Sequence, residues 1–408
     1  MTKQLENPFR PGAGHQPPYL AGRKEETEEF TRLLEQKIVM QNLVLTGLRG
    51  IGKTVLLESF KPIAQRDGWL WAGTDCSESA TVSEDTMAIR LLTDVALLTS
   101  GVKISEEHVP GLGFQSPVTI SSTNLTYDVL LNYYNGTPGL PTDKLRATLV
   151  FVWKCVEPIN AKGIIFAYDE AQTLTDHAEE KQFPLSMLLD TFQYLQRLGI
   201  PYLLVLTGLP SLVVKLVETR TYTERLSKVL TLGQLSAEES KEAIVRPIAS
   251  SGSVGFTEAS ISLLVKQSGG YPYFIQFLCR EVFDIFNLQY SRGEELSVPM
   301  DALLQKLDND FFAARWARAT EREKDLLTII AQAGLEEFGV QQVATLSQEN
   351  GKKPFSKSQV GQMFVRLIDA GLVYKDRRGA YSFAVPLLNG YINRLFEADI
   401  NRLQPRLF

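Results

Sequence analysis

The stretch from Gly47 to Thr54, GLRGIGKT, decides how the rest of the chain is interpreted. It fits the G-x-x-x-x-G-K-[ST] phosphate-binding loop (the Walker A motif) at every fixed position. The apolar run before it, residues 42–46, predicts a buried strand, and residues 55–60 after it predict a helix with an apolar face. A strand, a glycine-rich turn and a helix N-terminus form an anion site, because backbone N–H groups and the helix dipole both point at the anion.

The loop residues have separate predicted roles. The Lys53 ammonium would neutralise the β- and γ-phosphates of a nucleotide, and the Thr54 hydroxyl would ligate Mg²⁺. A Cβ at Gly50 or Gly52 would block the close approach of the backbone to the phosphates. The loop residues predicted to contact the nucleotide are Gly47, Arg49, Gly50, Ile51, Gly52, Lys53, Thr54 and Val55.

Composition and charge exclude several classes of protein. The chain has 408 residues, 44% hydrophobic and 22% charged, as expected of two or three globular domains. Its net charge of −5 gives no overall attraction to nucleic acid, so any DNA contact would need a local basic patch. Three scattered cysteines and three histidines argue against a disulfide scaffold and a histidine metal site. Without a signal peptide or a membrane-spanning apolar run, we expect a cytoplasmic protein without membrane contact.

A second decisive stretch is the apolar run 163–168, which predicts a strand buried on both faces of a parallel sheet. Asp169 and Glu170 follow it, at the end of the strand where open α/β sheets bind ligands. In an ATPase site, Asp169 would hold Mg²⁺ and Glu170 would orient or deprotonate the attacking water. The alternative is a helix N-cap with acidic residues in its first turn. The complete phosphate-binding loop favours the catalytic interpretation.

Three further candidates each have an ordinary alternative. Thr207 ends an apolar run, and its side chain could reach the γ-phosphate or the attacking water, or mark a simple strand-to-turn transition. Arg225 could supply positive charge to a phosphate, in cis or from a neighbouring subunit, or be a surface arginine. Gly22 and Arg23 precede the nucleotide-binding strand, where they could contact adenine or form a plain turn with a surface charge.

The pattern along the chain predicts an α/β fold with a parallel sheet, followed by helical parts. Within residues 320–408 we expect helices at 320–333, 339–349 and 356–370 and a hairpin at 372–383, the winged-helix arrangement. The chain is expected to have four parts: an extended arm (1–18), a P-loop core (19–235), a helical lid (236–298), and a linker helix with the winged helix (299–408). The core is expected to contain an irregular insertion at about 100–142, with a strand or hairpin near 114–123.

The predicted winged helix carries side chains suited to phosphate contacts and to reading the major groove of double-stranded DNA. Residues 320–408 nevertheless hold 12 Lys and Arg against 10 Asp and Glu, a weaker basic footprint than a dedicated DNA-binding domain shows. DNA binding and a packing role therefore both stay open. The candidate DNA contacts are Lys357, Gln359, Arg366, Lys375, Arg377 and Arg378.

Taken in order, these motifs resemble the AAA+ and STAND P-loop ATPases close to the archaeal origin-recognition (initiator) ATPases. The resemblance runs from about residue 20 to the end of the chain. Two of its motifs are the phosphate-binding loop (Walker A) and the Asp169-Glu170 pair (Walker B). Within the core it is also carried by the LAGR-x-E entry from Leu20, by Thr207 at the sensor-1 strand tip, and by the Glu224–Leu226 segment, which is similar to the arginine-finger region. The last two features are the G-x-P element Gly270-Tyr271-Pro272 of STAND lids and the winged helix.

The resemblance implies an ATPase that binds ATP or ADP with Mg²⁺, with Gly22, Arg23, Tyr271 and Pro272 near the base. It also implies a homo-oligomer in which Arg225 senses a neighbour's nucleotide. Sensor 1 is Thr where many relatives have Asn or Arg, and the lid has no obvious sensor-2 arginine, so slow turnover is expected. One expected function couples nucleotide state to assembly and DNA binding. The alternative is a STAND-type signalling switch acting on a separate protein partner, for example in defence against phage.

Overall fold

The computed structural model describes residues 6–12, 14–104, 124–219, 223–251, 255–350, 353–376 and 379–403. The chain divides into two compact units, and each is described by itself. The sheet unit consists of Arg23–Gly47 and Lys53–Leu232, and the helical unit of Met1–Gly22, Leu48–Gly52 and Gly233–Phe408. The strand or hairpin predicted near residues 114–123 lies outside the described residues.

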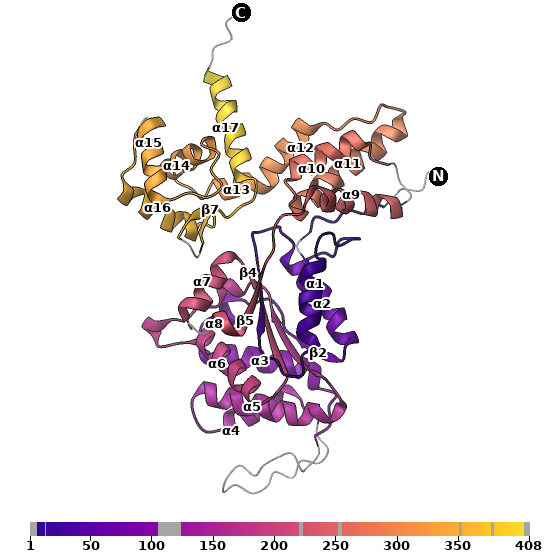
Figure 1. The fold of residues 1–408 in the computed structure, drawn as a ribbon, viewed down its shortest axis with the longest axis vertical. Coiled ribbons are helices and arrows are strands. Elements are labelled where there is room, and N and C mark those ends of the chain that lie inside the picture. The colour runs from indigo at the N-terminus through magenta and orange to yellow at the C-terminus, as the bar shows by residue number, and fades with distance from the viewer. Residues whose placement is uncertain are drawn as a thin grey trace, which may run out of the picture. The chain divides into compact units, whose positions relative to one another are not determined.

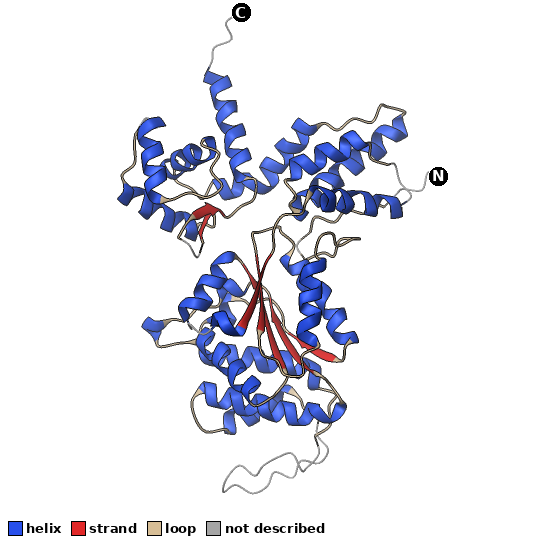
Figure 2. Ribbon diagram, viewed as in Figure 1, coloured by secondary structure: helices blue, strands red, loops and turns tan. Residues whose placement is uncertain are grey.

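The described strands of the sheet unit form one parallel sheet in the order β2-β3-β4-β1-β5 (Figure 2). β1, which leads into the phosphate-binding loop, lies between β4 and β5. Because the strands are parallel, β1, β3 and β4 end at the same edge of the sheet. The strands are β1 Asn42–Thr46, β2 Trp69–Ala72, β3 Gly163–Tyr168, β4 Tyr202–Gly208 and β5 Ser227–Thr231. The predicted α/β class with a parallel sheet is confirmed.

Helices cover both faces of this sheet (Figure 1). On one face, Phe30 of α1 stacks on Phe60 of α2 with ring centroids 4.1 Å apart, and Trp71 of β2 packs edge-on against Phe30. On the other face, Phe166 of β3 packs edge-on against Phe192 of α6 at 5.0 Å. The helices are α1 Lys24–Leu34, α2 Lys53–Arg66, α3 Glu84–Thr99, α4 Tyr127–Gly136, α5 Pro141–Val156, α6 Pro184–Arg197, α7 Pro210–Thr219 and α8 Thr223–Leu226, with short 3₁₀ turns η1 Glu78–Thr81, η3 Glu157–Ile159, η4 Ala171–Thr173 and η5 Ala178–Glu180.

Helix α4 was not predicted, since it lies in the segment expected to be irregular. Tertiary contacts hold it in place: Tyr134 is buried and its hydroxyl donates to the Asp85 carboxylate at 2.9 Å. Tyr133 stacks on Phe151 of α5 with centroids 4.4 Å apart. Burial of one aromatic face against α3 and α5 therefore stabilises a helix whose own sequence gives a weak signal.

The helical unit begins with α9 and continues through the C-terminal segment. An unbroken core of buried side chains joins its parts, including Phe274, Phe283, Phe312, Phe338 and Phe364. Its elements are α9 Ala237–Ser251, α10 Glu258–Ser268, α11 Pro272–Arg292, α12 Met300–Leu307, the π-helical turn η6 Asp308–Phe312, α13 Ala313–Trp316, α14 Glu321–Gln332, α15 Val340–Asn350, α16 Lys357–Asp369, the hairpin β6 Val373–Lys375 and β7 Tyr381–Phe383, and α17 Leu388–Leu403.

Helix α17 was also missed by the sequence reading. It packs along α14, and its Tyr391 stacks on Phe312 with centroids 5.2 Å apart. Its Arg394 forms an ion pair with Asp308 in the π-helical turn. These contacts tie the last helix to the segment between the lid and the predicted winged helix. No helix among the described residues is long and apolar enough to cross a membrane.

The N-terminal arm is packed into the helical unit. Phe9 is fully buried and packs against Phe256 and Phe283. Asn7 donates through its side-chain amide to the Arg280 carbonyl at 2.9 Å, and the Arg280 guanidinium donates to the Phe9 carbonyl at 3.1 Å. The backbone groups of an extended arm need partners outside it, and α11 supplies them for two groups, the Phe9 carbonyl and the Arg10 N–H.

Candidate active site

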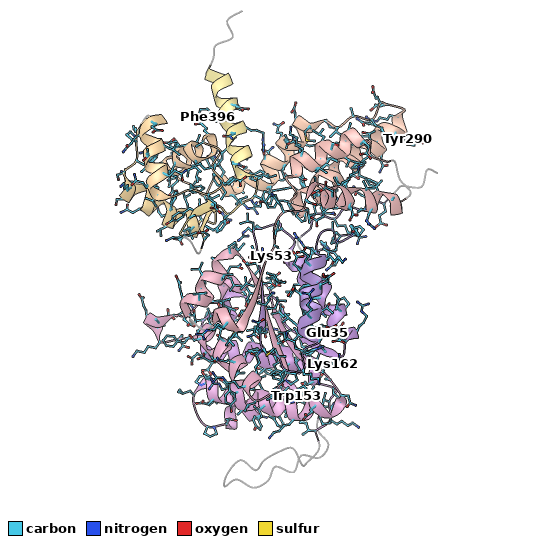
Figure 3. All side chains as sticks on the ribbon, viewed as in Figure 1. Glu35, Lys53, Trp153, Lys162, Tyr290 and Phe396 are labelled. Carbon is cyan, nitrogen blue, oxygen red and sulfur yellow. The ribbon has the colours of Figure 1, made fainter. Side chains whose placement is uncertain are left out.

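The phosphate-binding loop has the backbone that its sequence predicts. β1 ends at Thr46, and α2 begins at Lys53, whose side chain is buried (Figure 3). Gly50 and Gly52 have φ angles of 75° and 92°, in the left-handed region that other residues rarely adopt. The two glycines thus allow the turn that exposes successive N–H groups at the start of a helix.

The Thr54 hydroxyl donates a hydrogen bond to the Asp169 carboxylate. The other Asp169 oxygen accepts from the Glu170 backbone N–H at 2.8 Å. Burial raises the pKa of Asp169, and the hydrogen bonds from Thr54 and Glu170 oppose that shift. The two metal-binding residues predicted from separate motifs therefore lie in direct contact within the sheet unit.

Main-chain contacts fix Asp169 from the side of β2. The Asp169 N–H donates to the Thr74 carbonyl at 3.2 Å, and its carbonyl accepts from the Cys76 N–H at 2.9 Å. Gly73, just after β2, makes this approach possible, because a Cβ there would lie 1.9 Å from the Ala167 carbonyl oxygen. The segment after β2 thus acts as a backbone clamp on the carboxylate-bearing end of β3.

Glu170 has an exposed side chain on a left-handed backbone, with φ of 51°. The chain then turns through η4, where the Thr173 N–H donates to the Glu170 carbonyl at 3.0 Å. The Gln172 side-chain amide donates to the Glu170 carboxylate. The sequence reading missed Gln172, and its only local signal is its position two residues after the carboxylate.

Thr207 is fully buried near the end of β4, beside β1 in the sheet. Its hydroxyl has no hydrogen-bond partner among the described residues, and neither has the buried hydroxyl of Thr46 at the end of β1. Buried polar atoms are nearly always paired in native proteins, so two unpaired hydroxyls at one sheet edge mark a place for a polar ligand or water.

The remaining candidates in the sheet unit differ in exposure. Arg225 lies in α8 with an exposed side chain, and its carbonyl accepts from the Gln41 amide at 3.4 Å. Arg23 is buried and forms an ion pair with Glu26 at 3.5 Å. No hydrogen bond or ion pair between Arg225 and Asp169 occurs in the part of the sheet unit that the structure describes.

In the helical unit, the loop residues Leu48–Gly52 lie against the start of α11. The Tyr273 N–H donates to the Gly50 carbonyl at 3.1 Å, and a Cβ on Gly50 would lie 3.0 Å from the Tyr273 Cβ. A Cβ on Gly52 would lie 3.9 Å from Pro272. The predicted base-side residues Tyr271 and Pro272 therefore begin the helix that contacts the loop. Burial raises the pKa of Tyr271.

Gly22 belongs to the same unit and meets the start of the lid. With φ of 61°, a Cβ there would lie 2.7 Å from the Leu235 side chain. The Leu235 N–H donates to the Gly270 carbonyl at 2.8 Å. Gly22 and Gly270 thus reach a common neighbour, Leu235, which places the two predicted base-side turns close together.

Several candidate DNA contacts already have partners inside the chain. The Arg366 guanidinium pairs with the buried Glu323 carboxylate at 2.9 Å. The Gln359 side chain accepts from the Ser356 N–H at 2.9 Å, as part of the cap of α16. Lys357 and Lys375 have exposed side chains, and the Lys375 ammonium lies 5.6 Å from the centre of a tyrosine ring. Arg377 and Arg378 lie outside the described residues.

A family model described as "Domain of unknown function (DUF8462)" matches residues 309–392. No curated protein sequence matches the chain. Among solved structures, the chain is similar to the Aeropyrum pernix ORC2 protein in its ADP form, with 16% identity, 95% of this chain and 97% of that chain covered, and a TM-score of 0.55. The ADPNP-ADP complexes of the same protein give 15% identity, 96% and 98% coverage, and a TM-score of 0.52.

The chain has the AAA+ P-loop ATPase fold. At these identities the similarity establishes the fold, and it extends over nearly the whole length of both chains. The predicted resemblance to the origin-recognition ATPases is confirmed at that level. The loop after β1 and the end of β3 lie at the same edge of the sheet, and Thr54 and Asp169 meet there.

Proposed function

We propose that the protein binds ATP with Mg²⁺ and hydrolyses it, and that its nucleotide state controls self-assembly and DNA binding through a C-terminal winged helix. The hydrogen bond between Thr54 and Asp169 carries the nucleotide part of this proposal. It joins the hydroxyl of the phosphate-binding loop to the carboxylate after β3, and Glu170 stands next in the chain. A P-loop turn without such a carboxylate would have no second metal-holding group.

The side chains present fit a magnesium ion. Mg²⁺ prefers oxygen ligands and usually keeps several waters, with one or two carboxylates and the substrate phosphates completing its shell. The Thr54 hydroxyl and the Asp169 carboxylate supply two oxygens that already lie together. No cluster of three or more His, Cys, Asp and Glu side chains suited to a metal occurs in the described ranges, which fits an ion that arrives with the nucleotide. Once bound, the ion would neutralise charge on the phosphates.

The chain's own groups would do the rest of the work. Lys53 would pair with the β- and γ-phosphates, and the N–H groups at the start of α2 would hold their oxygens. The Glu170 carboxylate, which is exposed, would orient and deprotonate the attacking water. The unpaired hydroxyl of Thr207 would hydrogen-bond to that water or to the γ-phosphate.

Adenine as the base is supported by the similar Aeropyrum pernix protein, which was solved with ADP and with ADPNP. From the family resemblance, Gly22, Arg23, Tyr271 and Pro272 are the residues proposed to contact it. The Gly50–Tyr273 hydrogen bond would couple the nucleotide to the lid, since any shift of the loop on binding phosphate acts directly on α11.

The exposed Arg225 supports assembly. Its side chain is exposed on α8, from which it could supply charge to a nucleotide of its own chain or of a neighbouring subunit, and we propose the second arrangement. Charge from a neighbouring arginine lowers the barrier to phosphoryl transfer, so turnover would require a homo-oligomer. DNA contact would come from Lys357 and Lys375 together with the other basic candidates of the winged helix.

A second function is favoured by one observation on the same segment. Arg366 pairs with Glu323, and Gln359 caps α16, so two of the side chains predicted to read DNA have partners within the chain, although both are exposed. A winged helix used in this way could pack rather than bind DNA. The protein would then act as a STAND-type switch, with nucleotide exchange releasing a surface for a protein partner.

The deciding experiment measures ATP hydrolysis by the wild type and by Glu170→Gln, with and without double-stranded DNA, and determines the mass of each species in parallel. The proposal expects DNA-stimulated turnover and a larger ATP-bound assembly of the Glu170→Gln variant. A monomer that keeps ADP and ignores DNA would support the switch instead. If neither ATP nor ADP binds, the nucleotide proposal is wrong.

A further inference from the structure

Gln172 connects the two strand ends that carry Glu170 and Thr207. Its side-chain N–H donates to the Glu170 carboxylate, and its side-chain carbonyl accepts from the Leu209 backbone N–H at 3.0 Å. An uncharged side-chain amide donates at its nitrogen and accepts at its oxygen. Each end of Gln172 therefore has a partner of the right kind, on elements that follow β3 and β4.

The surroundings hold this amide in place. The Gln172 main-chain carbonyl accepts from the Lys215 ammonium of α7 at 2.6 Å. A Cβ on Gly208 would lie 2.8 Å from the Gln172 side-chain oxygen, so the glycine at the end of β4 leaves room for it. Residue 172 is thus anchored by its backbone, and its side chain fills a space shaped by the turn between β4 and α7.

The contact to Glu170 has a direct consequence for the site. Glu170 is exposed, and an exposed glutamate normally samples several rotamers. The hydrogen bond from Gln172 selects one of them. The same amide accepts from the Leu209 N–H, two residues after Thr207. The Glu170 carboxylate is therefore held at a fixed position relative to the end of β4.

We propose that Gln172 is a positioning residue for the hydrolysis reaction, which holds the Glu170 carboxylate in register with the Thr207 end of β4. This inference rests on the proposed ATPase function and adds a residue to it. The alternative is a purely structural role, in which Gln172 only fastens the turn between β4 and α7. The two roles use opposite ends of the same amide, so substitutions can separate them.

Two variants of Gln172 each retain one of its two side-chain hydrogen bonds. Gln172→Glu retains an oxygen that accepts from Leu209 but places a negative charge against Glu170. Gln172→Lys retains a donor for Glu170 but cannot accept from Leu209. A positioning role predicts that Gln172→Glu lowers kcat by about tenfold or more, because a misplaced general base forfeits much of the gain from proton transfer, and leaves ADP affinity and Tm near the wild-type values. It predicts that Gln172→Lys keeps more of kcat while losing Tm.

The control is Gln182→Glu, which adds the same charge to the sheet unit at another glutamine whose side-chain oxygen accepts from a backbone N–H, that of Glu84. It should leave kcat unchanged. A Gln172→Glu variant with wild-type kcat, while Gln172→Lys and Gln172→Ala lose Tm and kcat together, would show the structural role and overturn the inference. Glu170→Gln, measured alongside, separates the two proposals. If it turns over ATP like the wild type, or if the wild type does not turn over ATP, the proposed function fails and this inference with it.

Discussion

Thr54 and Asp169 are 115 residues apart in the chain, and a hydrogen bond joins their side chains. The contact requires that β1 and β3 end at the same edge of the sheet, one strand apart, which the order β2-β3-β4-β1-β5 provides. It also requires the clamp after β2 that holds the Asp169 backbone. The place where Thr54 meets Asp169 is thus assembled from the ends of three strands, β1, β2 and β3.

Asp169→Asn should make the protein more stable and less active. Burial raises the folded-state pKa of Asp169 above its unfolded value, so its contribution to stability is fully present below the unfolded pKa and is lost as pH rises through the folded pKa. At neutral pH the ionised side chain therefore costs stability, and the neutral amide removes that cost. We expect a higher Tm at pH 7, no gain in Tm at low pH, and a fall in Mg²⁺-dependent turnover of about a hundredfold or more.

That prediction is checked by thermal melts across pH together with ATPase assays. Asparagine still offers an oxygen to the Glu170 N–H and a donor to the Thr54 hydroxyl, so the local packing is retained. An Asp169→Asn protein that melts below the wild type at neutral pH would contradict the desolvation account. Full activity with Mg²⁺ would contradict its role at the metal.

Thr207→Val should separate catalysis from folding. The hydroxyl is buried without a partner, so its replacement by a methyl group of the same shape should leave Tm unchanged or raise it. If the hydroxyl contacts the γ-phosphate or the attacking water, turnover should fall by about tenfold or more. Thr46→Val, which removes the other unpaired hydroxyl at this edge, is the comparison. Equal turnover by wild type and Thr207→Val would remove Thr207 from the mechanism.

Gly50→Ala should weaken nucleotide binding and its coupling to the lid. The substitution forces a Cβ into the left-handed backbone and against Tyr273, at a cost of about 1–3 kcal/mol. The matched control is Gly199→Ala, which has a similar φ of 77° but open space around its Cβ. Both variants should lose Tm, and Gly50→Ala alone should lose ADP affinity in titration calorimetry. Equal ADP affinity of the two would show that the loop tolerates the change.

The basic residues of the predicted winged helix should fall into two groups. Arg366→Ala should lower stability by about 1–2 kcal/mol, because it leaves the buried Glu323 carboxylate without its cation. Charge reversal at the exposed Lys357 and Lys375 should leave Tm unchanged and weaken DNA binding by about tenfold, with a shallower salt dependence. Denaturant melts and DNA titrations at two salt concentrations distinguish the groups. Salt-insensitive or absent DNA binding by the wild type would favour the packing role.

The sequence was informative where chemistry needs a fixed local pattern. GLRGIGKT specifies its own turn, and the apolar run before Asp169 specifies a buried strand, so the α/β class and the two ends of the Thr54–Asp169 contact followed from short stretches. Helix boundaries with strong caps were also close to the observed ones. For α16, the cap at Ser356 is visible in the sequence as a serine followed three residues later by glutamine.

What the sequence could not show is set by contacts between distant residues. Helix α4 is stabilised by aromatic packing on α5, and α17 by packing on α14. Neither helix therefore has a strong signal in its own sequence. The role proposed for Gln172 depends on its hydrogen bond with Leu209 at the end of β4, which the sequence does not indicate. The ion pair of Arg366 with Glu323 joins residues 43 positions apart and has no local sign in the sequence, while DNA contact by Arg366 stays a prediction. In each case the deciding partner comes from another element.

The buried N-terminal arm has a consequence for how the protein is made. Phe9 is synthesised well before its partners Phe256 and Phe283, which lie 247 and 274 positions later in the chain. Domains generally fold as units during synthesis. The sheet unit, complete at Leu232, can therefore fold before the helices that pack against the arm have been synthesised. During that interval the Phe9 side chain lacks the two aromatic partners that pack against it in the folded structure. The arm therefore reaches its folded position only once α11, whose Phe283 contacts Phe9, has been synthesised.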